Sequence, residues 1–112
     1  MAHIPKTLKR YNHYRKKSDL VVIKYGAEWC GPCKKIKKFY NEIAGKEEYK
    51  NIYFLDVDID IDEINEHDDL SNIRSVPTFK FFINKELKYT MKGVDKEKFK
   101  ENLKELIKLS DK

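Results

Sequence analysis

The stretch Trp29-Cys30-Gly31-Pro32-Cys33-Lys34 holds both cysteines of the chain, separated by two residues. It closely follows the mostly apolar run Leu20 to Tyr25, which is typical of a buried strand. A Cys-x-x-Cys pair after such a strand indicates a redox site. If a helix begins at the first cysteine, the i, i+3 spacing places both sulfurs on one helix face, close enough to form a disulfide.

The expected helix start also makes Cys30 reactive. Unpaired N–H groups and the positive end of the helix dipole stabilise a thiolate there, which lowers the pKa of the Cys30 thiol below the ~8.5 of a free cysteine. Pro32 fits the first turn of the helix, where its missing N–H costs no hydrogen bond. We therefore expect Cys30 to act as the nucleophile and Cys33 as its partner thiol.

Length and composition predict one globular domain, residues 1–112, with a core that needs no structural disulfide or metal. Hydrophobic residues make up 40% of the chain and charged residues 38%, with a net charge of +5, so the surface is strongly ionic. Most of the basic residues are lysines, and they alternate with acidic residues along the chain. This pattern is typical of a solvated surface and argues against a nucleic-acid groove.

The N-terminal residues lack the apolar core of a signal peptide, and the longest aliphatic run, Leu20 to Ile23, cannot span a bilayer. We expect a cytoplasmic protein without a membrane partner. Because structural disulfides are unusual in a reducing cytosol, the cysteine pair is better explained as a working dithiol.

Hydrophobic periodicity predicts four helices and four strands. Helices are expected at 7–17, from the first cysteine (Cys30) to residue 44, within 60–69 and after Asp95. Strands are expected at 20–27, 51–58, 78–83 and 86–92. Asn84-Lys85 would form the turn that joins the last two strands in a hairpin. Gly45 would end the helix that precedes it, and Gly93 would end the strand that precedes it. The order predicts an α/β fold with a central mixed sheet and helices on both faces.

Several separated segments resemble the thioredoxin family. They are Ala27 to Lys34, Phe54-Leu55-Asp56-Val57-Asp58, Ile73-Arg74-Ser75-Val76-Pro77-Thr78-Phe79 and Gly93-Val94. The resemblance implies the thioredoxin fold and a thiol-disulfide oxidoreductase that reduces protein disulfides. It implies that Cys30 attacks, that Cys33 resolves, and that a Cys30–Cys33 disulfide results. No bound cofactor is implied; electrons would come from an NADPH-dependent thioredoxin reductase, and the protein would be a monomer.

The resemblance also assigns roles around the cysteines. It implies a cis Pro77 facing them, with Val76 offering backbone hydrogen bonds to an extended substrate and Thr78 beside it. It implies a flat apolar surface at Trp29, completed by Gly93 and Val94. The alternatives are an edge-strand proline at 77, core packing at 29 and an ordinary strand terminator at 93.

The residues between the cysteines, Gly31-Pro32, bear on the direction of electron transfer. They bring no positive charge to the thiolate, which predicts a reductant with a potential nearer ~−270 mV than ~−180 mV. An isomerase or oxidase of a secretory compartment is disfavoured for the same reason.

Two positions depart from the family pattern. Lys24 stands where most thioredoxins carry a buried aspartate, six residues before the first cysteine. Lys24 could support Cys33, either by stabilising its thiolate or by acting as a base. A stabilised thiolate would make the redox potential of the protein higher than that of a Lys24→Asp variant. Alternatively, Lys24 could pair with Asp56 as a purely structural substitution. Lys38 replaces a kinking proline, and with Lys34, Lys35 and Lys37 it makes the rim of the site basic.

Two other functions compete. Cys-x-x-Cys is half of a zinc knuckle, but His3, His13 and His67 have no ligand spacing, so no metal is expected. The domain could also be a thioredoxin-like subunit or scaffold whose redox activity is incidental.

Overall fold

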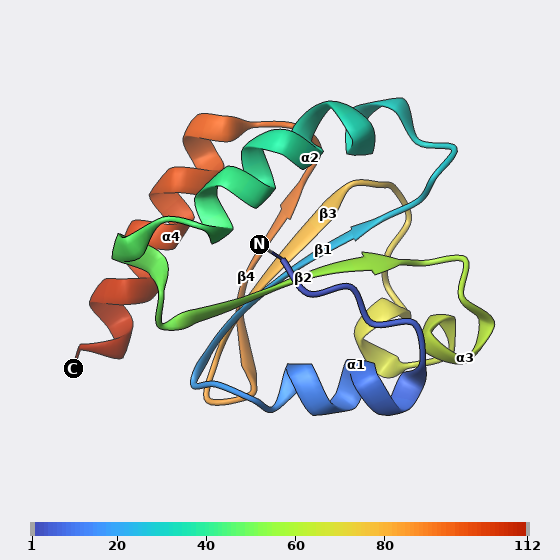
Figure 1. Cartoon of the computed structure of the whole chain (residues 1–112), viewed down its shortest axis with the longest axis horizontal. Helices are drawn as coiled ribbons and strands as arrows, with labels where there is room; N and C mark the ends of the chain where they lie inside the picture. Colours follow the sequence, from blue (N-terminus) through green and yellow to red (C-terminus); the bar gives the residue numbers. More distant parts are fainter. Residues whose placement is uncertain (1, 112) are drawn as a thin grey trace.

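The computed structural model describes residues 2–111; Met1 and Lys112 of the expected domain lie outside the described residues. A four-stranded sheet lies between helices on its two faces (Figure 1). The elements, with η denoting a 3-10 helix, are α1 (Leu8–Arg15), β1 (Leu20–Gly26), α2 (Gly31–Ala44), η1 (Glu47–Tyr49), β2 (Ile52–Asp58), α3 (Asp62–Asn65), η2 (Asp68–Leu70), β3 (Thr78–Ile83), β4 (Glu86–Lys92) and α4 (Lys96–Ser110). The expected mixed sheet flanked on both faces is confirmed.

The strand order is β2-β1-β3-β4, with β1 parallel to β2 and antiparallel to β3, and β4 antiparallel to β3. In this register Gly26 pairs with Asp58, and Thr78 pairs with both Tyr25 and Lys92. The ends of β1, β2 and β4 and the start of β3 therefore meet at one edge of the sheet. The loops that follow β1 and β2 and the loop that precedes β3 converge there.

Strand β1 is buried over its whole length because it is central and covered on both faces. Alternate residues point to opposite faces of a strand. Val22 packs in the cluster with α2 and α4, whereas Val21 and Ile23 pack in the cluster with α1 and α3. The same alternation places Lys24 on the face that α2 covers.

Helix α2 begins after Cys30, has a proline in its first turn and ends at Gly45, as expected. Its buried face consists of Cys33, Ile36, Tyr40 and Ile43. The Tyr40 hydroxyl lies 3.1 Å from the carbonyl oxygen of Val22 and 2.7 Å from that of Leu55. The helix that carries the cysteines is thus fixed to both β1 and β2.

On the opposite face, a polar network joins α1 to the sheet. The Tyr11 hydroxyl lies 2.7 Å from that of Tyr25 and donates to Asp69 Oδ2 at 2.6 Å. Arg15 Nε donates to the same carboxylate oxygen at 2.8 Å. We call Tyr11, Arg15, Tyr25 and Asp69 the polar clamp. Through it, α1 and η2 hold β1 from the side opposite the cysteines.

The C-terminal half follows the sequence prediction closely. Asn84 and Lys85, at φ 50° and 72°, form the hairpin turn between β3 and β4. The Asp95 side chain caps α4 by accepting from the N–H of Lys98 at 3.0 Å. Helix α4 packs on the sheet through Phe99, Leu103 and Leu106, which are buried, and Ile107, which is half-buried.

Two local features differ from the prediction. The single helix expected within 60–69 is divided into α3 and η2, because the chain turns at His67. In addition, His3 forms an isolated bridge beside β2, accepting from Asp56 N and donating to the Phe54 carbonyl, both at 2.8 Å. Within residues 2–111, no helix combines the length and apolar character needed to cross a membrane.

Candidate active site

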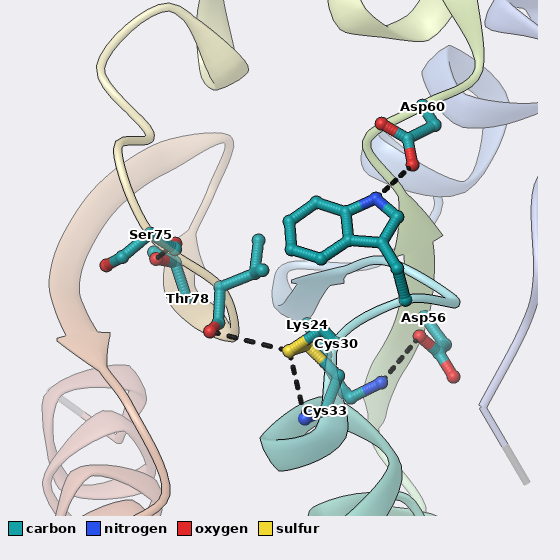
Figure 2. The surroundings of a disulfide bond; sticks show 9 residues. Lys24, Cys30, Cys33, Asp56, Asp60, Ser75 and Thr78 are labelled. Atoms are coloured by element: carbon teal, nitrogen blue, oxygen red, sulfur yellow. Dashed lines mark hydrogen bonds and ion pairs between the residues drawn. A yellow bond between two sulfur atoms is a disulfide. The ribbon is translucent and has the colours of Figure 1, made fainter.

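The cysteines lie where β1 passes into α2. Cys30 is the residue that caps α2, and its Sγ accepts a hydrogen bond from the backbone N–H of Cys33 at 3.2 Å (Figure 2). The two residues form a disulfide, with their Cα atoms 5.3 Å apart. The pairing that the resemblance implied is therefore present. A helix start with a donated N–H is also the environment that stabilises a cysteine thiolate.

Both cysteines are almost fully covered: Cys30 is 4% exposed and Cys33 is 3% exposed. They differ in the cavity that each one lines. Cys30 lines a depression, here called the groove, bounded by Trp29, Gly31 and Pro32 on one side and residues 73–76 on the other. Cys33 lines a second hollow of about 180 Å³, here called the rear cavity, together with Lys24 and Asp56. The two sulfurs therefore face different surroundings.

The far wall of the groove is the loop before β3. The Val76–Pro77 peptide bond is cis, as the resemblance implied. The carbonyl oxygen of Val76 lies 3.5 Å from Cys30 Sγ, so this backbone segment borders the reactive sulfur directly. Gly93 donates its N–H to the Pro77 carbonyl at 2.9 Å and has a φ of +84°, a conformation that favours glycine.

Thr78 has a different environment from the other expected substrate contacts. It is buried, and its hydroxyl donates to the Ser75 carbonyl at 2.7 Å. This hydrogen bond closes the loop around Pro77. The side chain of Thr78 therefore holds the groove wall from behind and does not line the groove.

Trp29 is 69% exposed, which excludes the alternative of core packing. Its indole Nε1 donates to Asp60 Oδ2 at 2.7 Å, and the side chain lines the groove together with Cys30. Val94, 43% exposed, adds a second exposed apolar side chain next to Gly93.

Lys24 forms the ion pair with Asp56 that was one of the two alternatives raised for it. It is 4% exposed, and its Nζ lies 3.0 Å from Asp56 Oδ1 on the neighbouring strand (Figure 2). It is also close to the second cysteine: a Cβ placed on Gly26 would lie 3.1 Å from Cys33 Sγ and 3.5 Å from Lys24 Nζ. The lysine is therefore ion-paired and beside Cys33 at the same time.

The other expected features of the rim are present. Lys38 lies within α2, which continues unbroken from Gly31 to Ala44. The four lysines of the basic rim, Lys34, Lys35, Lys37 and Lys38, are all exposed.

The histidines lie away from the cysteines. His3 stacks against Tyr14 and Tyr53, His13 packs on Tyr14, and His67 accepts a hydrogen bond from the N–H of Asp69 at 3.0 Å. Among residues 2–111, no group of three or more potential ligands from His, Cys, Asp and Glu is placed to hold a metal ion.

Sequence reasoning missed several residues of the site. Ile59, Ile73, Arg74 and Ser75 line the groove, and Asp60 holds Trp29. The available signal was topological: Ile59 and Asp60 directly follow a predicted strand parallel to β1, so they had to emerge at the same edge of the sheet as the cysteines.

A family model described as Thioredoxin matches residues 3–108 of the chain. The chain belongs to the thioredoxin family. It is 36% identical over 91 residues to the thioredoxin of Ophiophagus hannah, a match that covers 80% of this chain and 82% of that protein. It is 36% identical over 88 residues to the thioredoxin of Homo sapiens, which covers 79% and 80% of the two chains.

Solved structures of thioredoxins agree with this assignment. A thioredoxin of Plasmodium falciparum superimposes with a TM-score of 0.80 at 32% identity, covering 93% of this chain and 98% of that chain. A poplar thioredoxin h gives a TM-score of 0.81 at 25% identity, covering 95% and 96%. The thioredoxin fold is thereby confirmed, and with the Cys30–Cys33 disulfide at the start of α2 the chain is a protein-disulfide oxidoreductase of this family.

Proposed function

We propose that this protein reduces disulfide bonds of other proteins, with Cys30 as the nucleophile and Cys33 as the resolving thiol. The observation that carries the proposal is the position of Cys30. Its sulfur caps α2, is bonded to Cys33, and lines the groove beside the Val76 carbonyl. A partner chain in the groove would reach Cys30 before Cys33.

The proposed cycle begins with the reduced dithiol. The Cys30 thiolate attacks one sulfur of a partner disulfide, forms a mixed disulfide and releases the other partner sulfur as a thiolate. Cys33 then loses its proton and attacks Cys30 Sγ, which releases the second partner thiolate and leaves the Cys30–Cys33 disulfide. Two electrons pass from the dithiol to the partner, and the partner sulfurs take up two protons.

Substrate recognition is proposed to be small and mainly through backbone. An extended partner segment would pair with the backbone of Val76 next to the cis Pro77, and would rest on the exposed ring of Trp29. Gly93 and Val94 border the same region and would extend the apolar contact. Such a surface suits many partners because few side chains determine the fit.

We infer that a flavoprotein of the thioredoxin reductase type returns electrons from NADPH and that the chain itself binds no cofactor or metal. Gly31-Pro32 between the cysteines supports a reductant with a potential near ~−270 mV. We further infer that residues 1–112 form one domain, monomeric and cytoplasmic, with no nucleic-acid or membrane partner. The interleaved positive and negative charges support the absence of a nucleic-acid partner.

Insulin reduction tests the proposal. The protein is mixed with insulin, NADPH and a thioredoxin reductase, and NADPH oxidation is followed by absorbance. Wild-type protein is expected to turn over, whereas Cys30→Ser is expected to lose essentially all activity because no mixed disulfide can form. Equal rates for the two proteins would overturn the assignment.

The alternative of a scaffold is tested by trapping. Cys33→Ser is expected to accumulate mixed disulfides with partner proteins that dithiothreitol releases, because nothing resolves them. Cys30→Ser/Cys33→Ser is the control. A scaffold would bind its partners equally well in both variants, and that result would favour the alternative.

A further inference from the structure

We propose that the buried Lys24–Asp56 ion pair drives the resolving step of the reduction cycle: the Lys24 ammonium stabilises the Cys33 thiolate from below, and Asp56 keeps that ammonium charged and in position. This inference rests on the proposed function and adds a role that the cysteines and the groove do not explain. Lys24 and Asp56 act through Cys33 and do not touch the partner.

The first support is the position of the amine. Alternation along β1 points Lys24 to the face covered by α2, and its side chain is buried beneath the first turn of that helix. The Cβ position of Gly26 has only Cys33 Sγ, Cys33 Cβ and Lys24 Nζ as its three nearest heavy atoms, at 3.1, 3.4 and 3.5 Å. Because residue 26 is a glycine, it places no side chain of its own beside the amine and the sulfur.

The second support is that the amine, and not the carboxylate, is the member of the pair on the side of Gly26 and Cys33. The Nζ of Lys24 approaches the space beside Cys33 more closely than any atom of Asp56 does. The side chain of Asp56, 14% exposed, contacts the ammonium with its Oδ1 at 3.0 Å. On the side of Gly26, which Cys33 Sγ also borders, the positive member of the pair is therefore the nearer one. A nearby positive charge favours a thiolate, and the effect is strong where water is largely excluded.

Asp56 has a distinct part in this arrangement. A buried amine without a partner tends to lose its proton, because burial disfavours the charged form. The carboxylate favours the ammonium and fixes its direction. It also offsets part of the positive charge, so the net effect on Cys33 depends on both side chains.

Other charged groups surround the rear cavity. They are Lys6 from the N-terminal segment, Glu28 from the loop after β1, Lys34 and Lys37 from α2, and Asp58 from β2. Four of them are exposed, and Asp58 is half-exposed, so solvent and salt screen their fields. Both signs are present among them. The buried pair is the charged group best placed to act on Cys33.

The chemistry balances without a further reactant. When Cys30 is held in the mixed disulfide, the Cys33 thiol gives its proton to water that enters the rear cavity. The thiolate that remains is stabilised by the Lys24 ammonium, and it attacks Cys30 Sγ. The bond between Cys30 and the partner breaks, and the partner leaves as a thiolate.

The test measures the ionisation midpoint of Cys33 in a Cys30→Ser background, where one cysteine remains. Thiolate absorbance near 240 nm is followed against pH, and the rate of alkylation by iodoacetamide serves as a second measure. Lys24→Met is expected to raise the midpoint by about one pH unit. At a pH below both midpoints, the fraction of Cys33 present as thiolate would then be about tenfold smaller than with Lys24 in place. Asp56→Asn is expected to raise the midpoint as well, because the ammonium loses the partner that keeps it charged and in position.

The swap Lys24→Asp/Asp56→Lys keeps an ion pair but puts the carboxylate nearest the sulfur. It is expected to raise the midpoint, even if Lys24→Met alone fails to fold. Lys37→Met, at the mouth of the rear cavity, is the matched control and is expected to leave the midpoint within about 0.3 pH units. Circular dichroism verifies that each variant is folded.

A midpoint unchanged in both the swap and Lys24→Met would overturn the proposal, and a fall in Asp56→Asn would overturn the role given to Asp56. With both cysteines present, Lys24→Asp is expected to have a lower redox potential against glutathione than wild type, and equal potentials would contradict the proposal. None of these titrations needs a partner protein or a reductase. Failure here with intact insulin reduction by wild type would therefore refute only the role of the ion pair.

Discussion

Gly26 is the residue at which β1 comes nearest to the active site. A side chain there would place its Cβ 3.1 Å from Cys33 Sγ, closer than nearly all real contacts of that kind. Gly26→Ala is expected to destabilise the oxidised protein by about 1–3 kcal/mol, the usual cost of overpacking a close-packed site. Urea unfolding followed by circular dichroism measures the change.

Gly31→Ala is the matched control for that substitution. A Cβ at position 31 meets nothing within 4 Å, and alanine suits a helix better than glycine. This variant is expected to be as stable as wild type or more stable by about 0.5–1 kcal/mol. Equal losses of stability at the two glycines would show that the approach to Cys33 is not what requires Gly26.

Trp29 allows function to be separated from stability at a single side chain. Because it is 69% exposed, Trp29→Ala is expected to change the free energy of unfolding by no more than about 0.5 kcal/mol. Its loss from the groove is expected to lower kcat/KM for insulin reduction by about tenfold, as removal of an aromatic contact residue does.

Leu87→Ala controls for the loss of an exposed apolar side chain. Leu87 is 44% exposed and lies near the hairpin turn, at the edge of the sheet away from the disulfide. Insulin reduction by Leu87→Ala is expected to match that of the wild-type protein. A similar loss of activity in both variants would remove Trp29 from the proposed partner surface.

At this scale the sequence predicted what is local and missed what the fold brings together. The spacing of Cys30 and Cys33 after a strand predicted that the two sulfurs could form a disulfide, and the cis Pro77 followed from a family resemblance. Asp60 and Arg74 reach the groove from separate loops, so no local pattern revealed them. Sequence left the environment of Lys24 open because burial and pairing depend on the neighbouring strand.

The elements were predictable where their own residues determine their ends. Cys30 and Gly45 bound α2, and Asp95 caps α4, because caps and breakers act within a few residues. The division of residues 60–69 was not predictable. This segment packs mainly through Ile64 and Leu70, and tertiary contacts determine the shape of so short a stretch.

The polar clamp predicts how α1 and η2 respond to pH. Burial alone would raise the pKa of Asp69, but the hydrogen bonds from Arg15 and Tyr11 outweigh it and hold that pKa below its usual value. A carboxylate whose pKa is lower in the folded state stabilises the fold above its unfolded pKa of ~3.9. That contribution is lost as the pH falls through the folded-state pKa.

Asp69→Asn is therefore expected to be less stable than wild type by about 1–3 kcal/mol at pH 7, because a charged hydrogen-bond partner is lost. The difference is expected to shrink below pH ~4, where the Asp69 carboxylate of the unfolded wild-type chain begins to take up a proton, and to vanish as the pH falls through the lower folded-state pKa. Urea unfolding at several pH values between ~3 and ~7 measures both effects.

Asp68→Asn is the control for the clamp, since Asp68 is exposed and adjacent in sequence. It is expected to stay within about 0.5 kcal/mol of wild type at every pH. A constant difference between Asp69→Asn and wild type down to pH ~3 would contradict the role of the ionised clamp.

For the whole molecule, the net charge predicts a monomer. The net charge of +5 disfavours self-association. Analytical ultracentrifugation is expected to give a mass near 13.4 kDa for both the oxidised and the reduced protein. A dimer in either redox state would contradict this prediction.

The register of the hairpin has a practical consequence. Ile83 pairs with Glu86 beside the turn at Asn84-Lys85, whereas Thr78 pairs with Lys92 at the edge that carries the disulfide. The turn therefore lies one full strand length away from the reacting sulfurs. A peptide tag or fluorophore inserted between these two residues would report on the protein during turnover without obstructing an incoming polypeptide.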